Sequence, residues 1–205
     1  MSKAPVFIID DDAVVRDSLR ALIESAGFQV IDYESAASFL AEVSQVTLGC
    51  LITDIRMPGM DGLALQQELI KRKFQMPVIV ITGHGDVPLA VRAMKAGALD
   101  FIEKPFDDEV LLSSVRRGIE REQKTQEQAS LAGVATENLG ALTARERQVL
   151  DLLIVGHANK VIAHELDISP RTVEVHRGRV MEKMGARNLS DLVRSALAAG
   201  IDIGI

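Results

Sequence analysis

The sequence lacks the features that mark secreted and membrane proteins. Its 205 residues include a single cysteine, Cys50, so no disulfide can form within the chain, which favours a reducing compartment. No apolar stretch approaches the roughly 18 residues of a membrane-spanning helix, and the N-terminus has no long apolar signal segment. We therefore expect a soluble, cytoplasmic protein with no membrane partner.

An excess of positive charge is also missing, which taken alone argues against nucleic acid as a partner. The formal net charge is −6, but it is unevenly distributed. Residues 1–124 carry 14 basic and 19 acidic side chains, whereas residues 141–205 carry 9 basic and 8 acidic ones and three of the four histidines. The C-terminal third is thus neutral to slightly basic, and DNA binding stays open for it.

Short apolar runs rich in valine and isoleucine alternate with amphipathic stretches through the first 121 residues. The apolar runs have the length and boundaries of strands, and they lie at 6–9, 28–31, 50–53, 78–82 and 99–102. Helical patterns of about 10–14 residues follow the strands, as in crossover connections. This repeat predicts an α/β fold, a doubly wound parallel (βα)5 sheet.

Residues 122–140 interrupt this alternation. They are rich in Gln, Glu and Ala and have no apolar stripe, so we expect a linker whose first part can extend the preceding helix. From residue 141 onward only helical patterns remain, which predicts a small all-α four-helix domain. Thr143 and Glu146 have the spacing of a capping box at its first helix.

The carboxyl ends of the predicted strands carry polar side chains that can act together. Ligands bind at this edge of a doubly wound sheet, and it receives Asp10, Asp11, Asp54, Thr82 and Lys104. Close carboxylates repel one another unless a cation is bound, and oxygen ligands suit Mg²⁺. A metal-neutralised carboxylate can attack phosphorus, and a lysine ammonium can bind the phosphate oxygens. The set therefore predicts magnesium-dependent phosphoryl chemistry.

The segments "IIDDD", "LITDIRMPGMDG" and "VIVITGHGDVPLAVRAMKAGALDFIEKPF" resemble the receiver domain of two-component response regulators, over residues 4–121. The resemblance implies that Asp54 is the phospho-acceptor and that Thr82 and Lys104 contact the phosphoryl group. It further implies a magnesium site formed by Asp10, Asp11, Asp54 and the backbone carbonyl of Arg56. It also implies the flavodoxin-like strand order 2-1-3-4-5, an aromatic switch at Phe101 and a dimer contact at Val91 and Lys95.

The run "DDDAV" at residues 10–14 leaves an enzymatic alternative open, because it also fits the signature of haloacid-dehalogenase-type phosphatases. In that case Asp10 would be the nucleophile and Asp12 the general acid. This reading gives Asp54 and its Pro/Gly-rich loop no role, and it provides no cap insertion to shield a substrate. We therefore prefer a protein that is no enzyme beyond its own phosphorylation chemistry.

The predicted helix 170–184 has two unlike faces. On a helical wheel Val173, Val180 and Met184 form a narrow apolar stripe. The opposite face carries the candidates for base contacts, with Val175 suited to a thymine methyl group and Glu174 to a cytosine amino group; its members are Arg171, Glu174, Val175 and Gly178. Candidate contacts to DNA phosphates are Lys160, Thr172, Arg177, Arg179 and Lys183.

The segments "LTARERQVL" and "NKVIAHELDISPRTVEVHRGRVMEKM" resemble the LuxR/NarL-type output domain, over about residues 139–203. Together the two resemblances point to the FixJ/NarL family, with a receiver at 4–121, a linker at 122–140 and a helix-turn-helix domain at 141–205. They imply a phosphorylation-activated homodimer that binds double-stranded promoter DNA and works with RNA polymerase. A FixL-like sensor histidine kinase would be the phosphoryl donor and nitrogen-fixation genes the targets. A tail that binds protein rather than DNA stays open as an alternative.

Overall fold

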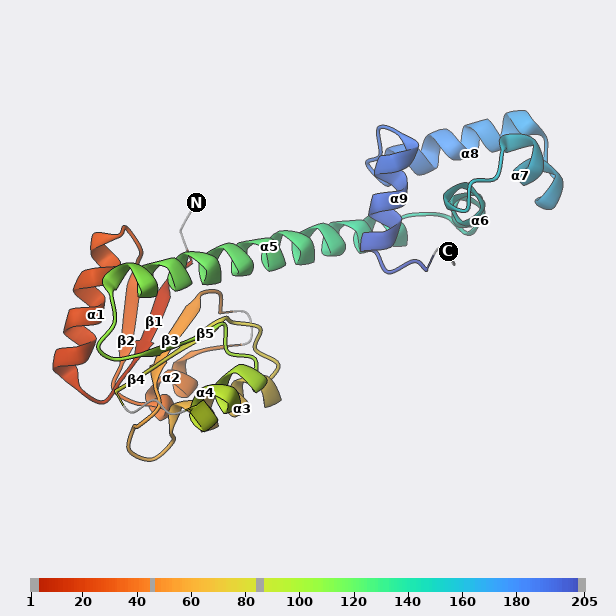
Figure 1. Cartoon of the computed structure of the whole chain (residues 1–205). Coiled ribbons are helices and arrows are strands. Elements are labelled where there is room, and N and C mark those ends of the chain that lie inside the picture. The colour runs from red at the N-terminus through yellow and green to blue at the C-terminus, as the bar shows by residue number, and fades with distance from the viewer. Residues whose placement is uncertain (1–3, 45–46, 84–86, 203–205) are drawn as a thin grey trace. The chain divides into compact units, whose positions relative to one another are not determined.

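The computed structural model describes residues 4–44, 47–83 and 87–202, which fold as two compact units. The N-terminal unit spans Met1–Lys124 and the C-terminal unit spans Thr125–Ile205. The division falls inside one long helix, and each unit has its own hydrophobic core. Figure 1 labels the elements of both units.

The N-terminal unit alternates strands and helices along the chain. Its elements are β1 (Val6–Ile9), α1 (Ala13–Ser25), β2 (Val30–Tyr33), α2 (Ala36–Glu42), β3 (Cys50–Asp54), α3 (Gly62–Lys71), β4 (Val78–Thr82), α4 (Val87–Lys95), β5 (Asp100–Glu103) and the first part of α5 (Asp108–Gly140). All neighbouring strands pair in parallel, in the order β2-β1-β3-β4-β5. The predicted doubly wound sheet is therefore confirmed.

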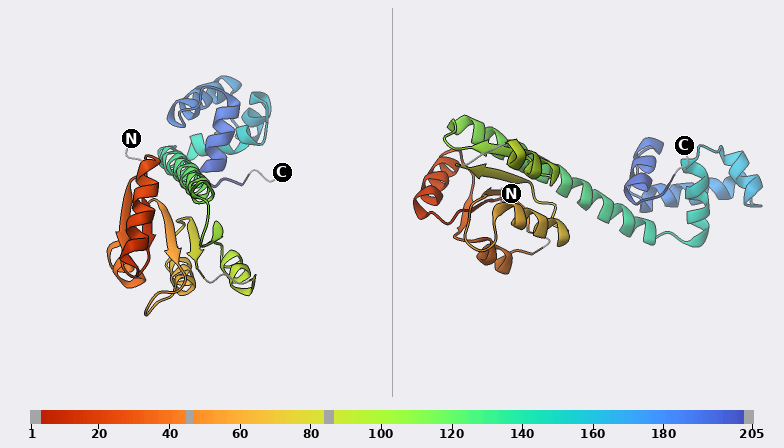
Figure 2. Two further views of the ribbon diagram at one scale, coloured as in Figure 1. Left: turned by 60° about the vertical axis from the view of Figure 1, so that its left-hand side comes forward. Right: turned by 60° about the horizontal axis from the view of Figure 1, so that its bottom comes forward.

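Both faces of the sheet are covered by helices (Figure 2). Successive residues of a strand point to opposite faces, and in β1 Phe7 and Ile9 pack on one side whereas Val6 and Ile8 pack on the other. Buried side chains of α2, α3 and α4 share the first side, and those of α1 and α5 share the second. This explains why the strands appear in the sequence as continuous apolar runs.

The second strand begins two residues later than the sequence indicated. The prediction placed it at 28–31, but β2 spans Val30–Tyr33 and includes an acidic residue, Asp32. Two arginines of α1 explain how a carboxylate is accommodated there, because Asp32 forms ion pairs with Arg16 and Arg20. These partners come from another element, so the local pattern around the strand could not reveal them.

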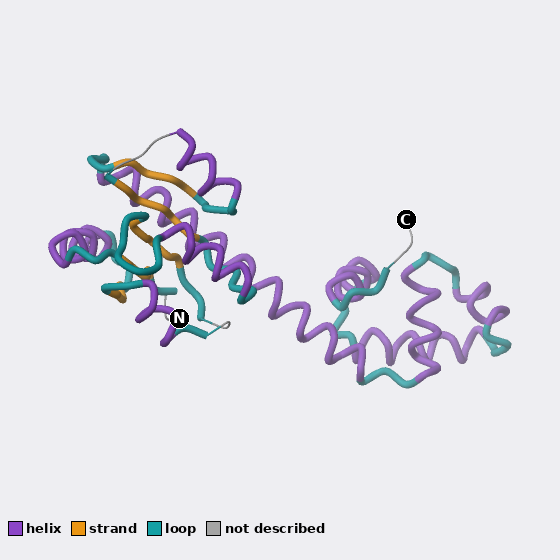
Figure 3. Tube along the Cα trace, turned by 90° about the horizontal axis from the view of Figure 1, so that it is seen from below, coloured by secondary structure: helices purple, strands orange, loops and turns teal. Residues whose placement is uncertain are grey.

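The C-terminal unit consists of the last part of α5 with α6 (Ala144–Ile154), α7 (Asn159–Glu165), α8 (Pro170–Lys183) and α9 (Leu189–Ala198), and no strand occurs among its described residues (Figure 3). The predicted capping box is present: the Thr143 hydroxyl accepts the Glu146 N–H, and the Glu146 carboxylate accepts the Thr143 N–H. In the parts of the chain that are described, no helix combines the length and the apolar character needed to cross a bilayer.

The segment predicted to be a linker is helical throughout. Helix α5 continues for 33 residues to Gly140, well past the polar region that begins at residue 122. Gln, Glu and Ala are good helix formers, so the helix persists where its apolar stripe ends. The packing of Ala135, which is 4% exposed, helps to anchor its last part. The limits of the predicted domains remain predictions.

Candidate functional site

The carboxyl edge of the sheet brings the predicted acidic and basic residues together. The Lys104 ammonium lies 3.0 Å from Asp10 Oδ2 and 3.2 Å from Asp54 Oδ1, so one cation bridges residues at the ends of two strands. Thr82 ends β4 next to them and is 1% exposed. Its carbonyl oxygen accepts the Lys104 N–H at 2.8 Å, which fixes the lysine at this edge.

Both carboxylates are buried and held by backbone donors. Asp54 Oδ2 accepts the N–H of Arg56 at 2.7 Å, and Asp10 Oδ1 accepts the N–H of Asp12 at 3.0 Å. Asp10 is 3% exposed and Asp54 is 8% exposed. These contacts point one oxygen of each side chain at Lys104 and use the other to fix the side chain's orientation.

Burial raises the pKa of the Asp54 carboxyl above its ordinary value of 3.8. The neighbouring Lys104 ammonium and the N–H of Arg56 act against this rise, and the negative charge of Asp10 adds to it. Lys104 is therefore the group that most opposes the effect of burial on this carboxyl. A dianionic group arriving here would meet a cation already in place.

The donor set fits a magnesium ion in chemistry, and two of its four predicted ligands lie together. Asp10 and Asp54 both contact one ammonium, so their oxygens are close, and carboxylate oxygens with room for water suit Mg²⁺. Asp11 and Arg56 are exposed at the same edge. Within the described residues, no group of three or more acidic, His or Cys side chains is placed to hold a metal.

Phe101 lies on the same side of the sheet as Thr82. It pairs in register with Val80, two residues before Thr82, and residues two apart along a strand share a face. The ring is half-buried against the cluster that includes Ala93 of α4. The predicted switch residue thus shares a face of the sheet with Thr82 and a core cluster with α4. The predicted dimer contacts Val91 and Lys95 are both exposed on that helix.

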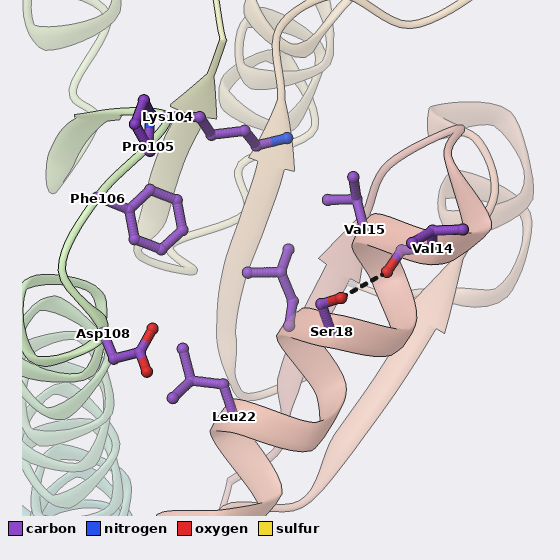
Figure 4. Close-up of a pocket in the computed structure, with 9 residues that line it drawn as sticks. Val14, Val15, Ser18, Leu22, Lys104, Pro105, Phe106 and Asp108 are labelled. Atoms are coloured by element: carbon purple, nitrogen blue, oxygen red, sulfur yellow. Dashed lines mark hydrogen bonds between the residues drawn. The ribbon is translucent and has the colours of Figure 1, made fainter.

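A cavity of about 550 Å³ opens beside Lys104 (Figure 4). Its other lining residues are Val14, Val15, Ser18, Leu19 and Leu22 of α1 together with Pro105, Phe106 and Asp108. The bond between Lys104 and Pro105 is cis. Val14 at the mouth is 72% exposed, so an apolar surface adjoins the acidic edge.

In the C-terminal unit, α8 has the two faces that the wheel predicted. Val173, Val180 and Met184 are at most 2% exposed and pack in the core. The opposite face is exposed, including Val175, which is 50% exposed. A Cβ atom built on Gly178 would meet nothing within 4 Å, so this helix carries a bare patch on its outer side.

Comparison with known proteins places both units in families. Residues 6–116 match the response regulator receiver domain, and residues 140–196 match the bacterial regulatory proteins of the luxR family. Transcriptional regulatory protein FixJ of Azorhizobium caulinodans is 52% identical over 197 residues, which cover 96% of this chain and 93% of that protein. FixJ of Bradyrhizobium diazoefficiens is 46% identical over 200 residues, which cover 98% of this chain and 98% of that protein.

The chain belongs to the FixJ-type response regulators. Solved structures agree: the response regulator StyR is 42% identical with a TM-score of 0.83, covering 95% of this chain and 98% of that one. Full-length FixJ from B. japonicum is 46% identical with a TM-score of 0.60, covering 98% of both chains. As a FixJ-type regulator, the chain combines a receiver with a LuxR-type DNA-binding domain and activates transcription in a phosphorylation-dependent way.

The phosphatase alternative is wrong, because FixJ-type regulators are transcription factors and not enzymes. The structure supplies a physical reason. Asp12, which would have to be the general acid, is instead the N-cap of α1, and its Oδ1 accepts the Val14 N–H at 2.8 Å. A carboxylate committed to a helix terminus is poorly placed to donate a proton to a leaving group.

Two of the predicted phosphate contacts of this FixJ-type regulator already have partners within the protein. The Lys183 ammonium lies 2.7 Å from Glu146 Oε2 and donates to the Ala141 carbonyl oxygen at 3.1 Å. Arg177 donates to Asn159 Oδ1 at 3.1 Å. Contact with DNA through either residue stays a prediction, and it requires that these bonds rearrange or be shared. The other predicted contact residues are exposed or half-buried: Lys160, Arg171, Thr172, Glu174, Val175, Gly178 and Arg179.

Sequence reasoning missed two residues that shape the receiver site. Arg16 donates from Nη1 to the Asp10 carbonyl oxygen at 2.8 Å while its Nε binds Asp32, so it fixes the end of β1. Gly62 begins α3 against Asp54, where an added Cβ atom would lie 2.2 Å from the Asp54 carbonyl oxygen. Gly62, the second glycine of "PGMDG", was a signal for this close approach, whereas no local sequence pattern marked Arg16.

Proposed function

We propose that Asp54 accepts a phosphoryl group from a FixL-like sensor histidine kinase, and that the phosphorylated chain dimerises and activates nitrogen-fixation or microaerobic genes in the cytoplasm. The observation that carries this proposal is the Lys104 ammonium, which contacts both buried carboxylates at the end of the sheet. The site positions a nucleophilic oxygen and a compensating positive charge on the same side of the incoming phosphorus.

In the transfer, the phosphorus–nitrogen bond of the kinase's phosphohistidine breaks as a bond forms between Asp54 Oδ and phosphorus. Lys104 leaves the carboxylate and pairs with the phosphoryl oxygens, and the Thr82 hydroxyl donates to them from the end of β4. A magnesium ion, held by Asp10 and Asp54 with Asp11 and the Arg56 carbonyl as further candidates, would neutralise charge on the transferred group.

The movement of Thr82 toward the phosphoryl group has a direct route to α4. Phe101 lies on the same face of the sheet and packs against the core cluster that contains Val80 of β4 and Ala93 of α4. The Phe101 ring can follow when Thr82 moves, and its movement changes the side-chain packing under α4. A small change of charge at Asp54 thereby biases the position of a whole helix.

Helix α4 carries the apolar surface that we assign to the homodimer. Val87, Val91 and Met94 are 77%, 45% and 47% exposed, and they recur at the spacing of one helical face. Lys95 adds a positive charge beside them. At this exposure Val91 is not packed inside the receiver. Pairing of this stripe between two copies would remove apolar surface from water.

Dimerisation brings two copies of α8 to one stretch of promoter DNA. Val175 and the bare patch at Gly178 suit close approach to base edges in the major groove, and Lys160 and Arg179 suit phosphates. Two subunits double the number of phosphate contacts, so affinity rises and becomes more sensitive to salt. RNA polymerase would then be recruited to the occupied promoter.

The cavity beside Lys104 fits the kinase. A phosphohistidine must reach Asp54 from the open side of the site, and the apolar side chains of α1 adjoin that side. We assign this surface, with Val14 at its mouth, to the helices that present the phosphohistidine. Binding there would hold the donor in line with Asp54.

The test is the Asp54→Asn variant with acetyl phosphate as donor. We expect no phosphate uptake and no tightening of promoter binding in gel shifts at a stated salt concentration, because the amide is a poor nucleophile. Asp17→Asn, an exposed carboxyl on α1, is the matched control and keeps both properties. Undiminished uptake by Asp54→Asn would refute the assignment of the acceptor.

A further inference from the structure

Helix α3 places one amide in the apolar layer beneath α4. Gln66 is 2% exposed and lies between the buried residues Leu65 and Leu69 on the same helix. A buried amide destabilises a protein unless its polar atoms are hydrogen-bonded. An aliphatic side chain would fill the same space without that cost, so the contacts of Gln66 indicate what the amide does.

The amide nitrogen binds the end of the neighbouring helix. Gln66 Nε2 donates to the carbonyl oxygens of Ala93 and Ala96 at 3.2 and 2.9 Å. These carbonyls lie at the C-terminal end of α4, where the last carbonyl groups of a helix lack donors within the helix. The Ala93 carbonyl oxygen also accepts the Ala98 N–H at 3.1 Å. One side chain of α3 therefore fixes the C-terminal end of α4.

This attachment matters because α4 is otherwise weakly held. Of its described residues only Ala93 is buried, and Val87, Val91 and Met94 are exposed. Its apolar contacts with the core come from Ala93 and the half-buried Leu89. A helix with so few buried residues is displaced at low cost, so the two bonds from Gln66 help to define the position of α4.

The other end of the same amide is unsatisfied. Gln66 Oε1 is buried and has no hydrogen-bond partner in the described structure. An unpaired buried oxygen destabilises the arrangement that contains it. In the resting contact between α3 and α4, the amide nitrogen of Gln66 is hydrogen-bonded and its amide oxygen is not. The unpaired oxygen offsets part of the stabilisation that the nitrogen provides.

Gln66 is also connected to the phosphorylation site. Helix α3 begins at Gly62, which lies directly against the Asp54 carbonyl oxygen. We propose that Gln66 is a positioning residue that holds α4 in its resting place and so sets the threshold for dimerisation. The inference rests on the proposed phosphorylation-dependent dimerisation through α4, and it adds the residue that regulates it.

The test compares Gln66→Met with Gln67→Met in the full-length chain. Gln67 is the adjacent residue on α3 and is exposed, so the same substitution there is the matched control. Sedimentation gives the dimer dissociation constant with and without beryllofluoride. We expect Gln66→Met to lower the constant about tenfold in the unmodified protein, the effect of losing about one net hydrogen bond. Gln66→Met should change the dissociation constant of the beryllofluoride form little, so the ratio of the constants of the unmodified and beryllofluoride forms becomes smaller.

A second measurement does not depend on dimerisation. Hydrogen exchange at the last turn of α4 should become about tenfold faster in unmodified Gln66→Met and stay unchanged in Gln67→Met. Gln66→Leu replaces the methionine variant if that one fails to fold. A wild-type protein that stays monomeric with beryllofluoride would overturn the proposed function, and exchange alone would then decide the role of Gln66.

Two results would overturn the inference itself. One is a Gln66 variant that matches Gln67→Met in both measurements. The other is a variant that melts earlier and exchanges faster but keeps the wild-type ratio of dissociation constants, which would make Gln66 a residue of the fold only.

Discussion

Replacement of Lys183 by methionine separates two roles that the sequence could not distinguish. The lysine was predicted to contact DNA, yet its ammonium lies 2.7 Å from Glu146 Oε2 and 3.1 Å from the Ala141 carbonyl oxygen. Glu146 is only 2% exposed. We expect Lys183→Met to lower the urea midpoint of the C-terminal unit, because it leaves a buried carboxylate without its cation. The salt dependence of DNA binding should not change.

Arg179→Met is the matched change on the same helix. Arg179 is exposed and forms no ion pair with the described residues. Its loss should leave stability within about 0.5 kcal/mol. If it contacts a phosphate, the slope of log K against log salt should fall by about 0.9 for each subunit, or about 1.8 for a dimer. Fluorescence anisotropy with labelled promoter DNA at several salt concentrations measures the slope.

The pH dependence of stability gives an independent reading of the Lys183 contact. Hydrogen bonds from Lys183 and from Thr143 lower the pKa of Glu146 from 4.5 to about 2. A lowered pKa stabilises the folded state above pH 4.5, and the contribution is lost as the pH falls from 4.5 toward 2. In Lys183→Met this acid-dependent loss should shrink, as followed by circular dichroism of the C-terminal unit.

The opposite pattern would refute this reasoning. If Lys183→Met lowered the salt slope as Arg179→Met does, and kept the wild-type urea midpoint and acid profile, Lys183 would be a DNA contact. The ion pair with Glu146 would then be incidental to the fold.

Two further changes test the receiver. A methyl group at Gly118 of α5 would lie 2.6 Å from Cys50 Sγ, so Gly118→Ala should destabilise the receiver by about 1–3 kcal/mol in urea unfolding. Cys50→Ala should relieve part of this, whereas Gly133→Ala, with nothing within 4 Å, should be neutral or stabilising; additive effects at 50 and 118 would contradict the contact. Val14→Glu should slow phosphorylation by a FixL-like kinase at least tenfold and leave uptake from acetyl phosphate unchanged, because Val14 lies at the mouth of the cavity and makes no contact with Asp54. Equal slowing with both donors would refute the assignment of this cavity to kinase docking.

The acidic site could be predicted because parallel strands bring their carboxyl ends to one edge. Four residues each end or follow an apolar run, and this local pattern was enough to predict that they lie at one edge: Asp10, Asp54, Thr82 and Lys104. The faces of α8 were likewise predictable, since helical periodicity alone separates Val173 from Val175.

Contacts between distant segments could not be predicted in this way. Asp32 lies within a strand because Arg16 and Arg20 come from α1, and Lys183 is engaged by a carboxylate 37 residues away. No periodic pattern records such pairs. Residues 122–140 differ for another reason: the sequence indicated a helix only in their first part, because a solvated helix has no apolar stripe and only its composition indicates it, whereas α5 continues to Gly140.

The position of Cys50 has a consequence for what this regulator can sense. Burial raises the pKa of its thiol to about 12, and the side chain is closely covered by α5 at Gly118. Peroxides and nitrosating agents react with thiolates, and this sulfur presents none to them. Cys50 is therefore poorly suited to reading a redox signal.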